Sequence, residues 1–262
     1  MRLERRTLGR LPSAGIGTGD PVLVIAGLTP NTGVDSERLT QASIGSLLAL
    51  KDRRRLVVVN RRPELPRGMT MAEMAAEHAD AIRALGAPVD VVGTSTGGSI
   101  AQQLAADHPD VVRRLVLLST ACRLGPEGKE LQRRVAARIR KGARRQAIAL
   151  MTSELVPPGR GRLAAGVVAS VVGPLLIRDP QGLDDMATTI EAEDSFDLAS
   201  CASPIAAPTL LVAGRDDRFY APELFEETAR LIPGCDLRVL DGKGHIAALA
   251  DARCRDAVES WL

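Results

Sequence analysis

The chain has 262 residues, which suffices for one large domain or two small ones with a substantial buried core. Hydrophobic residues make up 45% and charged residues 25%, as is usual for a globular protein, and a net charge of +2 gives no reason to expect a nucleic-acid partner. No stretch reaches the roughly 18 apolar residues of a membrane span, and residues 1–6 lack the long apolar region of a signal peptide.

Short apolar runs alternate with helical patterns along most of the chain. Residues 3–7 and their neighbours predict antiparallel edge strands. Buried parallel strands are expected at residues 21–27, 55–60, 89–92, 114–119, 209–214 and 237–240. Helices are expected at residues 71–85, 102–108, 222–232 and 245–262. This alternation predicts an α/β fold whose mostly parallel sheet is covered by helices on both faces.

The alternation stops between residues 123 and 204, where no strand is predicted. Helix-like stretches there are separated by two breakers that contain Pro and Gly, at residues 157–161 and 173–174. We interpret segment 123–204 as a helical cap over the strand ends, inserted between two parts of one core, 1–122 and 205–262. The longest apolar stretch of this cap, residues 167–176, is expected either to form the aliphatic roof of a pocket or to pack on the core.

A short glycine-flanked motif, Gly93-Thr94-Ser95-Thr96-Gly97, stands between a predicted strand and a predicted helix. This Gly-x-Ser-x-Gly form in that context is typical of a nucleophile elbow, in which a tight turn exposes the serine hydroxyl above the sheet. Ser95 is therefore the candidate nucleophile. The N–H of Thr96, at the start of the helix, is a candidate donor to the oxyanion of an acyl-transfer reaction.

A serine hydroxyl becomes a good nucleophile when a base takes its proton, so Ser95 calls for a histidine. The chain has three. His108 is interpreted as a surface residue at a polar helix end, and His78 as a core residue on the apolar face of a helix. His245 follows Gly242-Lys243-Gly244 directly after the last strand, where a flexible backbone can aim an imidazole across the strand ends. His245 is the predicted base.

An acid that orients the histidine should lie on another loop at the same edge of the sheet. Asp216 and Asp217 follow the strand at residues 209–214, and both are candidates. Their position in the chain, after the serine and before the histidine, gives the order Ser…Asp…His that α/β-hydrolases use.

These pieces together resemble the α/β-hydrolase fold over nearly the whole chain. The matching segments are residues 26–28, 93–98, 214–217 and 244–245, in the family's order and with a cap in the family's place. The resemblance implies that Asp217 is the acid, because the family's acid often follows the strand-ending glycine by three residues, and that Leu28 supplies the second oxyanion N–H. Ala26 stands where the family often has histidine, which leaves the conformation of loop 29–31 open.

The resemblance implies a serine hydrolase that cleaves a carboxylic ester, thioester or lactone of a small molecule through an acyl-enzyme on Ser95. Variants of the fold with the same triad perform cyclisation, C–C hydrolysis or perhydrolysis, and a non-catalytic ligand-binding protein is a further alternative. No cofactor, metal, nucleic acid or membrane is expected. Four single cysteines without metal-ligand spacing predict free thiols and a cytoplasmic location.

The predicted cap also carries a run of basic residues. They are Lys129, Arg133, Arg134, Arg138, Arg140, Lys141, Arg144 and Arg145. Such a run is typical of a solvated helix face, and it would also attract an anionic substrate or an acidic carrier protein.

Overall fold

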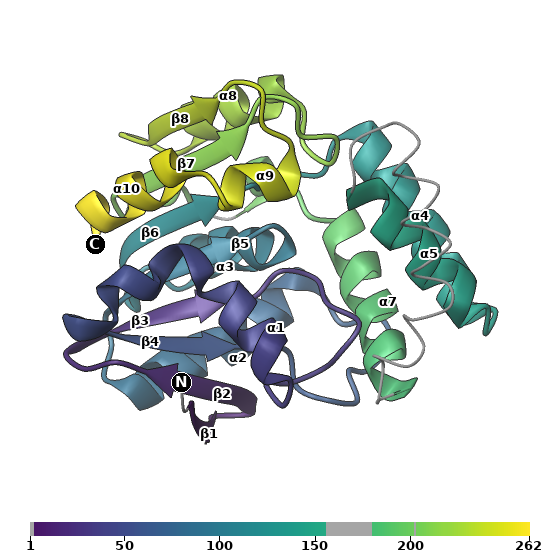
Figure 1. The fold of residues 1–262 in the computed structure, drawn as a ribbon, viewed down its shortest axis with the longest axis horizontal. Coiled ribbons are helices and arrows are strands. Elements are labelled where there is room, and N and C mark those ends of the chain that lie inside the picture. Colours follow the sequence, from purple (N-terminus) through teal and green to yellow (C-terminus); the bar gives the residue numbers. More distant parts are fainter. Residues whose placement is uncertain (1–2, 156–179, 202) are drawn as a thin grey trace.

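The computed structural model describes residues 3–155, 180–201 and 203–262. Eight strands in these residues form one sheet, in the order β1-β2-β4-β3-β5-β6-β7-β8 (Figure 1). The strands are β1 Glu4–Leu8, β2 Leu11–Ile16, β3 Asp20–Ile25, β4 Arg54–Val59, β5 Val89–Thr94, β6 Val112–Leu118, β7 Thr209–Gly214 and β8 Asp236–Leu240. From β4 to β8 all neighbours are parallel, and β1 and β2 are antiparallel. The predicted edge strands and parallel sheet are confirmed.

Each face of the sheet is buried under helices, because successive side chains of a strand point to opposite sides. In β3, Leu23 and Ile25 pack in the cluster formed with α2, α3 and α8, whereas Val22 and Val24 pack in the cluster formed with η1, α9 and α10. Both faces are apolar, so the central strands read as continuous hydrophobic runs rather than alternating ones.

The helices that flank the sheet follow the sequence pattern closely. They are α1 Glu37–Ser43, η1 Gly45–Asp52 (a 3-10 helix), α2 Met71–Leu85, α3 Thr96–Asp107, α8 Pro222–Leu231, α9 His245–Leu249 and α10 Ala252–Trp261. The expectation of one helix over residues 245–262 is wrong, since α9 and α10 are separate. Asp251 has extended backbone angles and its side chain accepts a hydrogen bond from the N–H of Arg253, so a new helix begins there.

The segment between β6 and β7 contains helices and loops but no strand in its described residues. It contains α4 Pro126–Arg140, α5 Arg144–Leu155, α7 Pro180–Asp194 and the short 3-10 helix η2 Leu198–Ser200. Figure 1 shows α4, α5 and α7 as a separate layer beside the strand ends of the sheet. Residues 167–176, the expected apolar roof, lie outside the described residues. No helix among the described residues is both long and apolar enough to cross a membrane.

Part of the basic run pairs with α7 rather than with solvent. The guanidinium of Arg133 bonds the Asp194 carboxylate at 3.0 Å, and that of Arg140 bonds Glu191 at 2.8 Å. The Nζ of Lys129 donates to the backbone oxygen of Asp194 at 2.9 Å. These contacts join α4 to α7, so the sequence interpretation of a purely solvated face is incomplete.

Candidate active site

The motif around Ser95 forms a tight turn between β5 and α3. Ser95 has φ 53° and ψ −127°, a conformation that side chains rarely adopt. A β-carbon at Gly93 would lie 2.6 Å from the oxygen of Gly97, and one at Gly97 would lie 2.6 Å from the oxygen of Ala26. Glycine is therefore required at both flanking positions, as the sequence motif predicts, and the turn presents the serine at the carboxyl edge of the sheet.

Ser95, His245 and Asp217 form a continuous chain of hydrogen bonds. The Nε2 of His245 lies 3.0 Å from the Oγ of Ser95, and its Nδ1 lies 2.7 Å from an oxygen of Asp217. The three residues follow β5, β8 and β7, and the carboxyl ends of these parallel strands meet at one edge of the sheet. The structure thus brings together the three side chains that were predicted to act together.

Asp217 and its neighbour Asp216 differ sharply in environment. The Asp217 side chain is fully buried, and its Oδ1 accepts the N–H groups of Phe219 at 2.8 Å and Tyr220 at 3.3 Å while Oδ2 faces His245. Asp216 is exposed, and its backbone N–H donates to the oxygen of Lys243 at 2.9 Å. Only Asp217 has the geometry of an orienting acid.

The loop that carries His245 is fixed at several points. The Oγ of Ser119 donates to the backbone oxygen of His245 at 3.0 Å, and the Phe219 ring lies 4.8 Å from the imidazole centroid. Gly242 turns the chain with φ 68°, whereas Gly244 keeps an ordinary φ of −87°. Only one of the two glycines before the histidine therefore uses its conformational freedom.

The other two histidines lie apart from this chain of bonds. His78 is 2% exposed on α2, and its Nδ1 lies 2.7 Å from the oxygen of Met74. Burial lowers the pKa of His78, so the ring stays neutral in the core. His108 follows α3 and bonds through its backbone N–H to Leu104.

The candidate oxyanion donors are the N–H groups of Leu28 and Thr96, and neither has a hydrogen-bond partner among the described residues. Gly27 brings the Leu28 loop against the elbow, since a β-carbon at Gly27 would lie 3.4 Å from the β-carbon of Ser95. Hydrogen bonds hold the loop that carries Leu28. Arg61 donates to the oxygen of Thr29, and the Thr29 hydroxyl donates to the oxygen of Asn31 at 2.8 Å.

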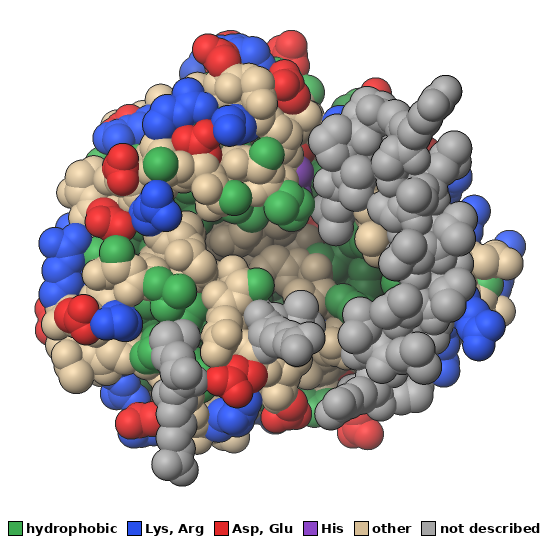
Figure 2. Space-filling model, in the orientation of Figure 1, with side chains coloured by type: hydrophobic (Ala, Val, Ile, Leu, Met, Phe, Trp, Pro, Cys, Tyr) green, Lys and Arg blue, Asp and Glu red, His purple; other side chains and the backbone are tan. Residues whose placement is uncertain are grey.

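A groove of about 400 Å³ reaches the elbow from the side of α1 and α9. Figure 2 shows this face of the molecule hollowed between α1, α9 and α7. The groove is mostly apolar, and many of its side chains are small. Its lining includes Gly27, Thr94, Ala42, Gly45, Ile246 and Leu249, and two charged residues, Asp251 and Arg255. Ile246, directly after the candidate base, is 47% exposed, which makes it the one large hydrophobic side chain exposed among the described residues.

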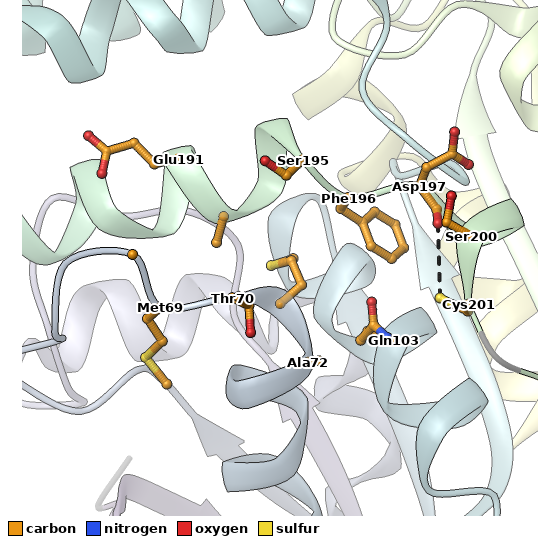
Figure 3. Close-up of a pocket in the computed structure, with 13 residues that line it drawn as sticks. Met69, Thr70, Ala72, Gln103, Glu191, Ser195, Phe196, Asp197, Ser200 and Cys201 are labelled. Atoms are coloured by element: carbon orange, nitrogen blue, oxygen red, sulfur yellow. Dashed lines mark hydrogen bonds between the residues drawn. The ribbon is translucent and has the colours of Figure 1, made fainter.

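A second cavity of about 400 Å³ contains none of the candidate catalytic residues. Figure 3 shows Met69, Thr70 and Ala72 on one side of it, at the start of α2, and Glu191 and Ser195 on the other, at the end of α7. No group of three or more His, Cys, Asp or Glu within the described ranges is arranged to hold a metal ion.

Glu193, on α7, was missed by the sequence analysis. Its side chain is fully buried and accepts a hydrogen bond from the hydroxyl of Thr96, next to the candidate nucleophile. A signal was present in the sequence, because Glu193 continues the buried helical stripe of Met186 and Ile190, where an apolar residue is expected.

A sheet of this order, with a serine, an acid and a histidine at its carboxyl edge, defines an α/β-hydrolase fold with a triad-like site. Residues 22–258 match the model of the alpha/beta hydrolase family, and the chain belongs to that family. The predicted fold and the resemblance are confirmed, and the protein is a hydrolase.

Several known proteins are similar to this chain. A pimeloyl-[acyl-carrier protein] methyl ester esterase of Neisseria meningitidis serogroup B is 32% identical over 200 residues, which cover 70% of this chain and 74% of the relative. The structure of an esterase from Thermogutta terrifontis superposes with a TM-score of 0.72 at 25% identity, covering 100% of this chain and 98% of that one. An enol-lactonase from Burkholderia xenovorans, at 22% identity and a TM-score of 0.74, covers 98% of both chains and shows the same fold.

Proposed function

We propose that the protein is a serine hydrolase that cleaves a carboxylic ester, thioester or lactone of a small molecule through an acyl-enzyme on Ser95. The observation that carries the proposal is the chain of bonds from Ser95 through His245 to Asp217, with distances of 3.0 and 2.7 Å. These are the distances at which a base can take a hydroxyl proton and an acid can orient that base. The esterases among the similar proteins support the choice of bond.

The proposed reaction has two halves. The Oγ of Ser95 attacks the carbonyl carbon while His245 Nε2 takes the hydroxyl proton, and the N–H groups of Leu28 and Thr96 stabilise the resulting oxyanion. His245 then gives this proton to the leaving oxygen or sulfur, which departs and leaves an ester on Ser95. Water, deprotonated by the same nitrogen, attacks that ester, and its proton returns to the Ser95 oxygen as the carboxylic acid is released.

The groove beside the elbow indicates an apolar substituent on the substrate. Gly27 and Thr94 adjoin Ser95, and most of the exposed wall further out is apolar, although Asp251 and Arg255 also line the groove. A short aliphatic chain would lose water contact along the apolar part without needing a polar partner. We propose that α4, α5 and α7 form the cap over the opposite side of the reacting carbonyl.

Gly45→Val is expected to lower kcat/KM about tenfold for esters whose acyl or alcohol part has four or more carbons. The kcat/KM for methyl acetate should stay within twofold of the wild-type value. Apart from its chain neighbours and its own helix backbone, no atom lies within 4 Å of the β-carbon position of Gly45, so the groove has room for valine. The measurement is kcat/KM over two ester series, one lengthened in the acyl part and one in the alcohol part, beside thermal melts. An equal loss for all chain lengths, or no loss, contradicts the assignment of the groove.

Labelling with a fluorophosphonate tests the proposed nucleophile directly. Intact-mass and peptide analysis should place one adduct on Ser95, because this reagent reacts with serine hydroxyls that have an adjacent base. Protein denatured before labelling is the control, since it has the same serines without the hydrogen-bonded histidine. A folded protein that stays unmodified at Ser95 would instead favour a binding function for the site.

Basic side chains on the proposed cap could attract an anionic substrate or an acidic carrier. Within the described residues, Arg134, Arg138, Lys141 and Arg145 form no ion pair. They lie along the second half of α4, directly after it and at the start of α5, and a group of cations raises the local concentration of negative ligands.

A further inference from the structure

A buried carboxylate lies beneath the candidate active site and has no part in the reaction above. Glu193 is 0% exposed, and each of its oxygens accepts two hydrogen bonds. Oε2 accepts from the Thr96 hydroxyl at 2.7 Å and from the Gln132 amide at 3.0 Å. Oε1 accepts from the Ser99 hydroxyl at 2.8 Å and from the Tyr220 hydroxyl at 3.0 Å. All four donors are neutral and buried.

On each oxygen, one donor belongs to a residue with a proposed part in the catalytic chain, and the other donor does not. Thr96 directly follows Ser95, and its N–H is a proposed oxyanion donor. Tyr220 donates its N–H to Asp217 at 3.3 Å, and its ring lies 6.0 Å from the His245 ring at an interplanar angle of 20°. By contrast, Gln132 lies on α4, and Ser99 lies one turn along α3. Ser99 contacts Ser95 through its backbone N–H, a bond that alanine keeps, and not through the hydroxyl that Glu193 accepts.

We propose that Glu193 is a positioning residue that fixes Thr96 on the nucleophile side and Tyr220 on the acid side of the same site. The proposal rests on the proposed function, since it concerns the alignment of that reaction. One carboxylate on α7 thereby links the helical layer to both ends of the catalytic chain, which come from separate loops at the edge of the sheet.

The chemistry of the group suits this role. A carboxylate has four acceptor positions and no donor, so it can hold four donors at fixed directions. A buried polar group that loses its partner is costly, so each of the four side chains is strongly held in its bonded rotamer. Burial and the nearby Glu193 carboxylate hold the pKa of Tyr220 well above its usual range, so its hydroxyl keeps the proton that it donates.

The experiment removes one donor at a time from each oxygen. Thr96→Val and Gln132→Met each take a donor from Oε2, and Tyr220→Phe and Ser99→Ala each take one from Oε1. Steady-state kcat and KM on a chromogenic ester and the melting temperature are measured for all four full-length variants. Each pair is matched, because both members remove one hydrogen bond from the same oxygen.

We expect Thr96→Val and Tyr220→Phe to lower kcat about tenfold with KM within threefold, because a small misplacement of catalytic groups slows chemistry more than binding. Gln132→Met and Ser99→Ala should lower the melting temperature by a similar amount and keep kcat within about twofold. Equal kcat losses within either pair, or no loss in any variant, would overturn the proposal, because Glu193 would then only hold helices together.

A double-mutant cycle shows whether Thr96 acts through Glu193. Glu193→Met removes all acceptors, and adding Thr96→Val to it should lower kcat no further, since the two changes break the same bond. Additive losses would overturn the proposal, and the single-donor variants decide it if Glu193→Met does not fold. A wild-type protein without ester turnover would overturn the proposed function and this inference with it, whereas an active wild type with unselective variants overturns the inference alone.

Discussion

Ser95→Ala is expected to lower ester turnover by about 10⁴- to 10⁶-fold while the protein stays folded, as for other members of such triads. The change removes the one oxygen that lies 3.0 Å from His245 Nε2. The backbone of the elbow keeps its bonds, because the N–H of Ser95 donates to Leu118 and its carbonyl accepts from Gly98 and Ser99. The measurement is kcat on an activated ester, with circular dichroism melts to establish folding.

Ser99→Ala is the matched control for this variant. Ser99 is a buried serine on α3, four positions after Ser95, and its hydroxyl bonds Glu193 rather than the base. Turnover by a folded Ser95→Ala protein at even a tenth of the wild-type rate would refute the assignment of Ser95 as nucleophile.

Asp217→Asn is expected to lower turnover by about 10³- to 10⁴-fold, because an amide at this position favours the wrong imidazole tautomer. The Asp217 carboxylate lies 2.7 Å from His245 Nδ1 and is held by two backbone N–H groups, so it is already oriented before substrate binds. Turnover is measured with the same ester at a pH where the wild type is fully active.

Asp216→Asn provides the comparison for Asp217→Asn. Asp216 is the adjacent, exposed carboxylate, and its loss should change turnover several-fold at most. A larger effect at position 216 than at position 217 would mean that the neighbouring carboxylate orients the base.

The fold was predictable because its determinants are local. Helix α2 occupies the predicted residues because both ends are encoded nearby: Thr70 and Glu73 form a capping box, and Gly86 ends the helix in the left-handed conformation. The buried strands were visible as apolar runs between glycine- and charge-rich stretches. The break between α9 and α10 was missed although Asp251 is a good N-cap, because the apolar pattern continues through it.

The site was predictable in part. The residues that were found have signals close to them in sequence, whereas the residue that was missed makes its contacts with distant parts of the chain. Ser95 has a motif within five residues, and His245 was found by elimination among three histidines. The helical stripe of α7 could have indicated that Glu193 is buried, but its hydrogen bonds join α7 to α3, α4 and the loop after β7, so the residues near it in sequence do not reveal its partners. The anchoring of the oxyanion loop by Arg61 is equally nonlocal, since 32 residues separate Arg61 from Thr29.

The scarcity of aromatic residues gives the protein a natural optical reporter. The chain contains a single tyrosine, and that residue, Tyr220, lies beside the His245 ring in a fully buried setting. The tyrosine band of its near-ultraviolet circular dichroism therefore originates from one side chain next to the proposed base. The single tryptophan, Trp261, also contributes in this region, and the spectrum of Tyr220→Phe gives its share for subtraction. The remaining change on inhibitor binding or heating follows the order of this site, while the far-ultraviolet signal follows the helices and strands of the whole fold.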